Sequence, residues 1–234
     1  SDPEPNLWGG FRTATTPDGA FHVIWDISLS GVAAIRYRQL SSNGVWGVVD
    51  TLTQDLGISD MGLAVDAAGC LHAGWFKRHE YTSSDLYYRS RCGSTAAAAA
   101  PKWRRSPDDR NLLRFDVSPS GVVQALLSHD TGYDYVRREV DGRTITEHLS
   151  GNIQNAPSMI LDSAGTPHIA FTALAETGWF NFFYTTRSEA GQWSEPVNVS
   201  DSIGTGYGAT LAADDMGNIH ALWYFHSVTA PTYE

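Results

Sequence analysis

Recurring Asp–His pairs are the first residues in this chain that could do chemistry. The His follows the Asp by six residues in three places: Asp66 with His72, Asp162 with His168, and Asp214 with His220. Carboxylates and imidazoles serve as acid–base groups and as metal ligands, but copies about 50 residues apart do not have the short spacings of metal-ligand motifs. No metal or cofactor is therefore indicated. We expect each His to bond a nearby turn or strand group and each Asp to form a turn.

The pairs belong to a longer repeat. Its clearest copy, DSAGTPHIAF at 162–171, matches 66–75 and 214–223 in having Asp, Gly, His and a large apolar residue at fixed spacing. A fourth copy at 16–25 keeps Gly, His22 and Trp, with Asp18 displaced, and a fifth at 118–127 has Gln124 in place of His. The copies start 44 to 52 residues apart. This period indicates a propeller or a solenoid.

Each unit is predicted to contain four antiparallel strands. An alternating segment precedes the Asp-x-x-Gly turn, the His strand follows it, and a Tyr-Arg segment and a Gly-to-Trp segment complete the unit. Four-stranded antiparallel units of this length are propeller blades. We predict an all-β fold, a single β-propeller domain over 1–234, with repeats near 10–50, 60–104, 112–148, 156–199 and 208–234.

This pattern, "D..G..H..W, then YR, then G.W", resembles that of the bacterial sialidase-like, or BNR-like, propellers. The likeness covers nearly the whole chain and implies the fold. The strict Asp-box Ser-x-Asp-x-Gly-x-Thr-Trp is absent from the sequence, so sialidase activity is not implied.

The composition and net charge limit the classes of partner that the protein could bind. Apolar residues make up 42% of the 234 residues and charged residues 18%, which supports a folded core. The net charge of -10 argues against a nucleic-acid partner, which needs a clustered basic face. No apolar run reaches the length of a membrane span, and residues 1–10 lack the features of a signal peptide. We expect a secreted, extracellular or periplasmic protein whose signal peptide has been removed.

Cys70 and Cys92 flank a predicted hairpin and would lie opposite one another in it. A disulfide and a pair of buried free thiols are both compatible with this placement. A disulfide would favour an oxidising compartment.

The fifth unit ends at Glu234, where its third strand should start. Either the two ends of the chain close the ring irregularly, or the chain is part of a longer or multi-chain propeller. An open sheet edge is an association site, so the second interpretation predicts a homo-oligomer or a partner chain at this blade.

Function is expected where the repeats differ, in the loops between second and third strands and between fourth and first strands, which share one face. These loops collect aromatic, acidic, basic and imidazole side chains that suit a glycan, because sugars offer apolar faces and hydroxyl groups. The candidate ligand-binding residues are His79, Tyr81, Arg110, His129, Asp130, Tyr133, Glu176, Trp179, Tyr207 and His226.

Three functions follow from these residues. The first is a non-enzymatic, lectin-like propeller that binds a glycan or glycoconjugate, and the second is a glycan-active enzyme. A hydrolase would use two carboxylates from Asp26, Asp60, Asp130 and Glu176, whereas a lyase would use a base beside a neutralising cation, drawn from His79, Tyr81, His129 and Arg110. The third is a subunit of a larger propeller assembly. No catalytic residue is singled out by a motif.

Overall fold

The protein folds into consecutive antiparallel sheets, as the repeat predicts. The computed structural model describes residues 10–29, 32–79, 83–92, 102–106, 112–150, 153–176, 178–200, 204–214 and 216–227, and all regular elements among them are strands. At some strand ends, including His79, Tyr207 and His226, only the backbone is described. No helix among these residues is long and apolar enough to cross a membrane.

Four sheets have four strands each, and a fifth has two described strands. Consecutive strands are neighbours in every sheet, so each sheet is a meander, called a blade below. Blade 1 contains β1 (Phe11–Thr15), β2 (Phe21–Leu29), β3 (Val32–Leu40) and β4 (Asp50–Asp55). Blade 2 contains β5 (Ile58–Val65), β6 (Leu71–His79), β7 (Ser83–Arg91) and β8 (Lys102–Ser106). Blade 3 contains β9 (Leu112–Val117), β10 (Val123–His129), β11 (Gly132–Arg138) and β12 (Thr144–Ser150). Blade 4 contains β13 (Ile153–Leu161), β14 (Pro167–Leu174), β15 (Phe180–Thr186) and β16 (Val197–Asn198), and blade 5 contains β17 (Gly204–Ala213) and β18 (Ile219–Ser227).

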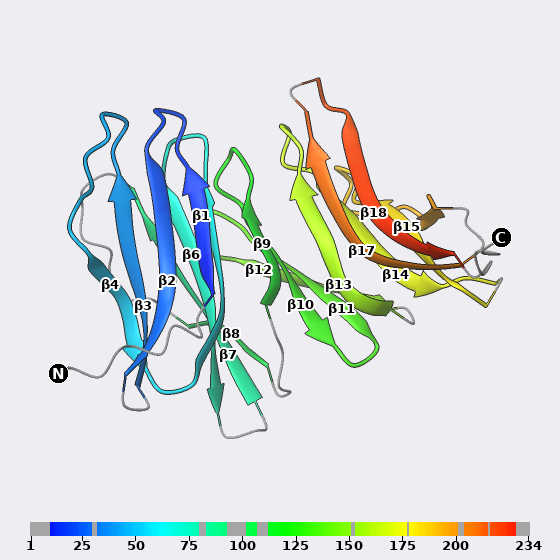
Figure 1. Ribbon diagram of the computed structural model, residues 1–234, viewed down its shortest axis with the longest axis horizontal. Helices are drawn as coiled ribbons and strands as arrows, with labels where there is room; N and C mark the ends of the chain where they lie inside the picture. Colours follow the sequence, from blue (N-terminus) through cyan, green and yellow to red (C-terminus); the bar gives the residue numbers. More distant parts are fainter. Residues whose placement is uncertain are drawn as a thin grey trace, which may run out of the picture.

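The first strands of the blades contact one another in chain order, β1 with β5, β5 with β9, β9 with β13 and β13 with β17. The sheets consequently follow one another in an arc, with the first blade at one end and the last at the other (Figure 1). This is a β-propeller arrangement. Hydrophobic side chains fill the spaces between blades: Ile24 and Trp75 pack between blades 1 and 2, Leu127 and Phe76 between blades 2 and 3, and Ile169 and Tyr135 between blades 3 and 4.

The Asp-x-x-Gly segments form tight turns. In blade 2 the backbone N–H of Gly69 donates to the carbonyl of Asp66, and Oδ1 of Asp66 accepts from the N–H groups of Ala68 and Cys70 at 3.0 and 2.8 Å. Gly69 has φ of 77°, a left-handed conformation that glycine adopts without a steric cost. Cys70 and Cys92 follow this turn and the end of β7, and a disulfide joins them.

The strands extend further than the sequence predicts. The segments 26–34 and 128–134 were expected to be loops, but β2 reaches Leu29, β3 starts at Val32, and β10 and β11 are separated only by Asp130 and Thr131. The expected Trp strand is found in blade 2, where Trp103 lies in β8, but it is wrong in blades 1 and 4, where Trp46 and Trp193 make isolated bridges before β4 and β16. The low-complexity segment 93–101 lies outside the described residues.

Candidate functional site

The recurring His residues join the turns to the third strands. His72 meets Oδ2 of Asp66 through Nε2 at 3.1 Å and the hydroxyl of Tyr88 through Nδ1 at 2.7 Å. His168 repeats both contacts with Asp162 and Tyr184 at 3.3 and 2.6 Å. These chains of polar contacts lie within single blades. The structural role predicted for the His and Asp residues is confirmed.

Burial and neighbouring charges set the protonation of these groups. Burial lowers the pKa of His72 below its usual 6.5, and hydrogen bonding to Asp66 only partly opposes this. Burial raises the pKa of Asp162, but hydrogen bonds from the backbone of Thr166 and from His168 outweigh burial, so the pKa is lowered overall. At neutral pH the ring of His72 is therefore neutral and Asp162 is ionised.

The predicted binding residues do not all meet on one rim. Tyr81 and Arg110 lie outside the described residues, and the side chains of His79, Tyr207 and His226 are not described. Glu176 is exposed in the turn between β14 and β15, and Trp179 is half-buried in the same turn. Tyr133 was expected to be exposed, but this side chain is only 5% exposed and packs in the core between blades 3 and 4. Its place in β11 is buried because its neighbours across the interface, Met159 and Ile169, are apolar.

His129 and Asp130 lie at the end of blade 3, where a second imidazole joins them. The register pairs His129 with Gly132 and Asp134 with His148, so the side chains of His129, Asp134 and His148 project from the same face of the sheet. The rings of His129 and His148 approach to 4.3 Å between centroids. Gly132 separates them in the sheet and has φ of 147°; a Cβ there would lie 2.1 Å from the carbonyl oxygen of Leu149. The glycine is therefore required by the close approach of the neighbouring backbone.

Thr131 connects the two imidazoles. Its hydroxyl lies 3.0 Å from Nδ1 of His129 and 3.1 Å from Nε2 of His148, and its backbone N–H donates to the same Nδ1 at 3.1 Å. Nδ1 of His148 lies 3.0 Å from Oδ1 of the buried Asp134. All these contacts are satisfied when His148 carries both ring protons and the Thr131 hydroxyl donates to His129; this assignment follows from the partners.

The resulting chain, from Asp134 through His148 and Thr131 to His129, holds one mobile proton. Nε2 of His129 has no hydrogen-bond partner among the described residues, whereas the other ring nitrogens in the chain are engaged. In this form Nε2 of His129 carries a hydrogen. When that hydrogen is released, Nδ1 of His129 takes one from Thr131 and Thr131 takes one from His148. Uptake of a proton at Nε2 reverses these transfers and restores the imidazolium of His148, which Asp134 stabilises. The cluster, defined as His129, Thr131, Asp134 and His148, is suited to general acid–base chemistry.

The same residues are the group in the described chain that could hold a metal ion. One ligand atom from each of His129, Asp134 and His148 lies within 4.8 Å of the others. Three of the ring nitrogens already have protein hydrogen-bond partners, so a metal would have to displace the contacts made by Thr131. The geometry therefore fits proton transfer better than metal binding.

His148 was missed by the sequence reasoning, which looked for function in loops. This residue lies in β12, and only the antiparallel register brings it opposite Asp134. A signal did exist: four of the eight His residues occupy the repeat position, and His148 is among the remaining four.

Two of the candidate hydrolase carboxylates line one cavity between blades 1 and 2. Asp26 and Asp60 share this cavity of about 270 Å³ with Arg12 and Ser59. Asp60 has φ of 42° at a β-bulge where the register shifts between Ser59 and Met61. Bulges recur beside functional sites because they redirect side chains. Asp130 and Glu176 are exposed and do not line this cavity.

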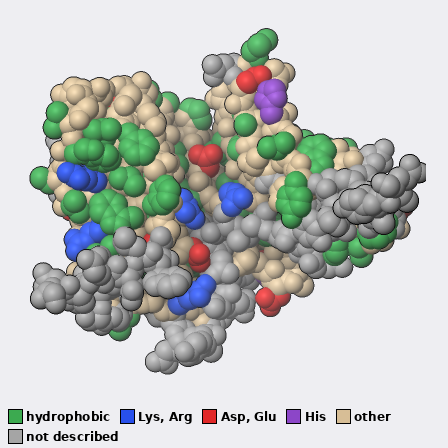
Figure 2. All heavy atoms as spheres, viewed as in Figure 1, with side chains coloured by type: hydrophobic (Ala, Val, Ile, Leu, Met, Phe, Trp, Pro, Cys, Tyr) green, Lys and Arg blue, Asp and Glu red, His purple; other side chains and the backbone are tan. Residues whose placement is uncertain are grey.

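Charged side chains also gather in the middle of one face of the molecule. Figure 2 shows several Lys, Arg, Asp and Glu side chains in the middle of one face, between the blades at its two sides. Burial lowers the pKa of Arg114, and the charge of Arg12 lowers it further. These two cations from different blades therefore repel one another.

Comparison with solved structures supports the fold. The chain is similar to the polysaccharide lyase Uly1 with a TM-score of 0.55 and 11% identity, over 92% of this chain and 54% of that one. It is similar to a puromycin hydrolase with a TM-score of 0.53 and 12% identity, over 93% and 42% of the two chains. Prolyl oligopeptidase B from Galerina marginata matches with a TM-score of 0.51 and 10% identity, over 92% and 30%.

These likenesses identify the β-propeller fold and do not transfer an activity. The chain spans about half or less of the length of these structures. No protein-family model matches the chain, and no curated protein matches it in sequence. The resemblance to sialidase-like propellers therefore stays a prediction.

Proposed function

We propose that the protein is a glycan-active enzyme of the polysaccharide lyase type, with the cluster at the end of blade 3 as its catalytic site. The observation that carries the proposal is the chain of contacts from Asp134 through His148 and Thr131 to His129. The similarity in fold to a polysaccharide lyase supports it. This favours the enzymatic alternative over the lectin-like function expected first.

A lyase cleaves a uronate-containing chain by β-elimination. A base removes the C5 proton beside the carboxylate, the C4–O bond breaks, a C4=C5 double bond forms, and an acid protonates the departing oxygen. His129 accepts the first proton at Nε2 in the form of the cluster in which His148 is neutral and the hydrogen of His129 lies on Nδ1. Nδ1 then gives its hydrogen to the Thr131 oxygen, and the Thr131 hydroxyl hydrogen moves to Nε2 of His148. Returning a proton along the same path supplies the acid. In this scheme His129 is the catalytic residue, and Thr131 and His148 act through it.

The substrate carboxylate needs a neutralising cation, because the elimination builds negative charge beside it. We assign this role to Arg110. In the sequence it stands two residues before Leu112, the first residue of β9, which pairs with Leu127 of the strand that ends at His129. The Cys70–Cys92 disulfide suits an oxidising compartment, so secretion is part of the proposal.

The test is a panel of uronate-containing polysaccharides, assayed by ultraviolet absorbance of the conjugated double bond. His129→Ala should reduce kcat by about 10²- to 10⁴-fold, as expected for a lost acid–base group. Thr131→Val keeps the shape but removes the hydroxyl, so we expect a smaller loss and a changed pH profile of kcat/KM. His220→Ala alters an exposed repeat His outside the cluster and should retain activity.

Folding of each variant is checked by its thermal melt. Full activity of His129→Ala on a substrate that the wild type cleaves would contradict the proposal. So would the absence of unsaturated product from every polysaccharide in the panel.

A hydrolase is the second candidate, favoured by the cavity that Asp26 and Asp60 share. It would release reducing ends without unsaturated product. Asp26→Asn and Asp60→Asn should then abolish activity while His129→Ala does not, which distinguishes the two enzymes.

A further inference from the structure

Blade 1 breaks the pattern of polar contacts that the other His-containing blades share. His22 keeps the bond from Nδ1 to the hydroxyl of Tyr37, at 2.9 Å. Thr16 stands where blade 2 has Asp66, and its hydroxyl contacts the carbonyl of Ala20 and the carboxylate of Asp18. His22 is only 4% exposed, and its Nε2 has no hydrogen-bond partner among the described residues. A buried polar atom without a partner costs stability unless a ligand or water satisfies it.

The tautomer of His22 follows from the other blades. In blades 2 and 4 the Asp carboxylate can only accept, so Nε2 carries the hydrogen and Nδ1 accepts from the Tyr hydroxyl. The same bond to Tyr37 in blade 1 leaves an N–H at Nε2 of His22. Burial lowers the pKa of His22, and Arg91 lowers it further against the opposing effect of Asp18. The ring is therefore a neutral donor at pH 7.

This donor lines a cleft of about 550 Å³ between blades 1 and 2. Thr16, Pro17 and Asp18 form one wall and Ala67, Ala68 and Gly69 belong to the turn opposite, while His22, Tyr37, Gln39 and Arg91 contribute polar groups. The volume is in the range of small-molecule sites. The cleft lies at the Asp-x-x-Gly turns, whereas the catalytic cluster lies at the β10–β11 hairpin at the other end of the strands.

Arg91 adds a positive charge to this cleft. Its guanidinium lies 5.6 Å from the centre of the Tyr37 ring and 3.5 Å from Oδ2 of Asp50. Arg138 stacks in the same way over Tyr88, between blades 2 and 3, at 5.1 Å. The two interfaces differ in that His72 has its Asp partner and His22 does not. Only the first interface combines the stacked Arg with an unpartnered buried N–H among these described residues.

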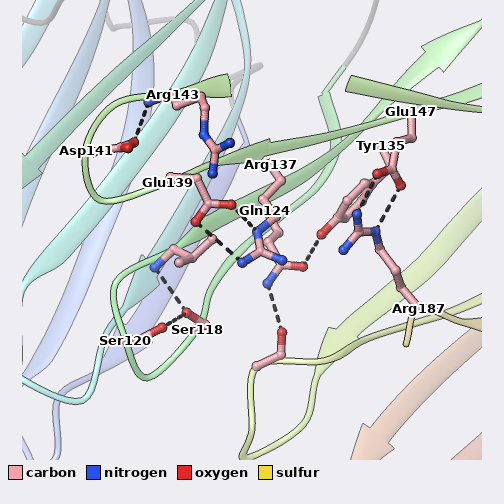
Figure 3. Close-up of polar contacts among 12 residues, drawn as sticks. Ser118, Ser120, Gln124, Tyr135, Arg137, Glu139, Asp141, Arg143, Glu147 and Arg187 are labelled. Atoms are coloured by element: carbon pink, nitrogen blue, oxygen red, sulfur yellow. Dashed lines mark hydrogen bonds and ion pairs between the residues drawn. The ribbon is translucent and has the colours of Figure 1, made fainter. Parts of the chain in front are cut away.

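In blade 3 the polar position that corresponds to His22 is satisfied by the protein itself. Gln124 replaces the His, accepts the hydroxyl hydrogen of Tyr135 at 2.6 Å and donates to the carbonyl of Gly165 in the next blade at 2.9 Å (Figure 3). Gly165 belongs to the turn that corresponds to the one at Gly69. The repeat therefore provides two ways to satisfy this position, an Asp or a Gln, and blade 1 uses neither.

We propose that the cleft between blades 1 and 2 is a second, non-catalytic binding site that recognises the carboxylate of a small organic acid. The volume of the cleft suits a ligand of the size of an acidic sugar. The carboxylate accepts from Nε2 of His22 and pairs with Arg91, which gives two hydrogen-bond donors of which one is charged. Pro17, Ala67 and Ala68 provide the apolar surface for the remainder of the ligand.

The experiment is isothermal titration of the full chain with glucuronate, with glucose and acetate as the comparison ligands. The wild type should bind glucuronate saturably and should not bind glucose, because glucose lacks the carboxylate. Displacement of glucuronate by acetate supports recognition of the carboxylate itself. Equal binding of glucose, or no binding of glucuronate, overturns the proposal.

Two variants remove the unpartnered N–H of His22 by copying the residues that the other blades have at this position. The double substitution Thr16→Asp with Asp18→Ala restores the Asp–His pair, since the residue two positions after the Asp is Ala68 in blade 2 and Ala164 in blade 4. His22→Gln copies blade 3. Both should fold and weaken glucuronate binding by about tenfold or more, the value of a lost hydrogen bond to a charged group.

Arg138→Gln is the matched control. It removes an equivalent stacked Arg from an interface whose His is satisfied, and binding should be unchanged. Unaltered binding in both the double substitution and His22→Gln would overturn the proposal. The readout is binding and is separate from cleavage by His129, so each proposal can fail alone.

Discussion

Burial of the repeat His residues makes the stability of their blades depend on pH. Burial lowers the pKa of both His22 and His72 from 6.5, so the folded protein holds these rings neutral. The unfolded chain protonates them near pH 6.5. Between that value and the lower folded pKa, the unfolded state binds more protons, and stability falls as the pH falls.

We therefore predict that the protein loses stability when the pH is lowered from 7.5 to 5, beginning near pH 6.5. His72→Gln should retain the contact with Tyr88 and remove one of the groups responsible, so its stability should depend less on pH than that of the wild type. Thermal melts at intervals of pH measure both. Lys77→Gln is the control, because the side chain that it removes does not titrate in this pH range. Parallel pH curves for His72→Gln and the wild type would contradict the assignment.

At the scale of single residues, the repeat made the structural His and Asp predictable. A side chain that recurs at one position in several blades must meet the same neighbours in each. His148 was not predictable in this way, because its role depends on the register between β11 and β12, which places it opposite Asp134. Tyr133 was misplaced for the same reason: its position on a strand face decides whether it meets solvent or blade 4.

At the scale of elements, close packing of β9 against blade 2 depends on two glycines. A Cβ at Gly62 would lie 2.2 Å from Cβ of Phe115, and one at Gly74 would lie 2.6 Å from its ring. Neither glycine has a left-handed φ, so the need for glycine comes from the neighbouring strand and not from the backbone conformation. The repeat shows the strands, but this contact joins different blades and has no local sequence signal.

Gly74→Ala is expected to destabilise the protein by about 1–3 kcal/mol, the cost of overpacking a core. Gly47→Ala is the control, since its added Cβ would meet the nearest atom, the carbonyl oxygen of Gln39, at 3.5 Å. Denaturant unfolding measures both. Combining Gly74→Ala with Phe115→Ala should cost less than the sum of the single changes, because the ring that clashes has gone. Additive effects would contradict a direct clash.

At the scale of the whole molecule, Arg–Tyr stacking recurs between successive blades. Arg91 lies over Tyr37, Arg138 over Tyr88, and Arg187 over Tyr135, the last at 5.8 Å. Each Arg belongs to the blade after the one that contributes the Tyr. The Tyr-Arg segments were visible in the sequence, but their pairing across blades depends on the order of sheets in the arc. The angle between neighbouring sheets determines how many blades close a ring. This angle depends on many such contacts together, so no single sequence motif predicts it.

The interface between blades 3 and 4 has an additional anchor. Glu147 of β12 accepts from Nε of Arg187 at 2.9 Å and from its terminal nitrogen at 2.6 Å (Figure 3). It also accepts from Nε1 of Trp193 at 2.7 Å. Trp193 packs edge-on against Tyr135 with centroids 5.0 Å apart. Burial raises the pKa of Glu147, but the hydrogen bonds from Arg187 and Trp193 outweigh it and lower the pKa overall. This carboxylate therefore joins two blades while ionised.

Glu147→Gln keeps the shape of the side chain but removes its charge and one acceptor. We expect a loss of about 1.5–3 kcal/mol in the free energy of unfolding at pH 7, the range for hydrogen bonds to charged groups. Because the folded pKa lies below the usual 4.5, the contribution is present above that pH and is lost as the pH falls, so variant and wild type should converge in acid. Glu139→Gln disturbs an ion pair with Arg137 inside blade 3 and should cost less. Denaturant unfolding at pH 7 and pH 4 measures these losses in stability, and limited proteolysis locates the interface that opens. Equal losses for the two variants would show that Glu147 does not hold the blades together.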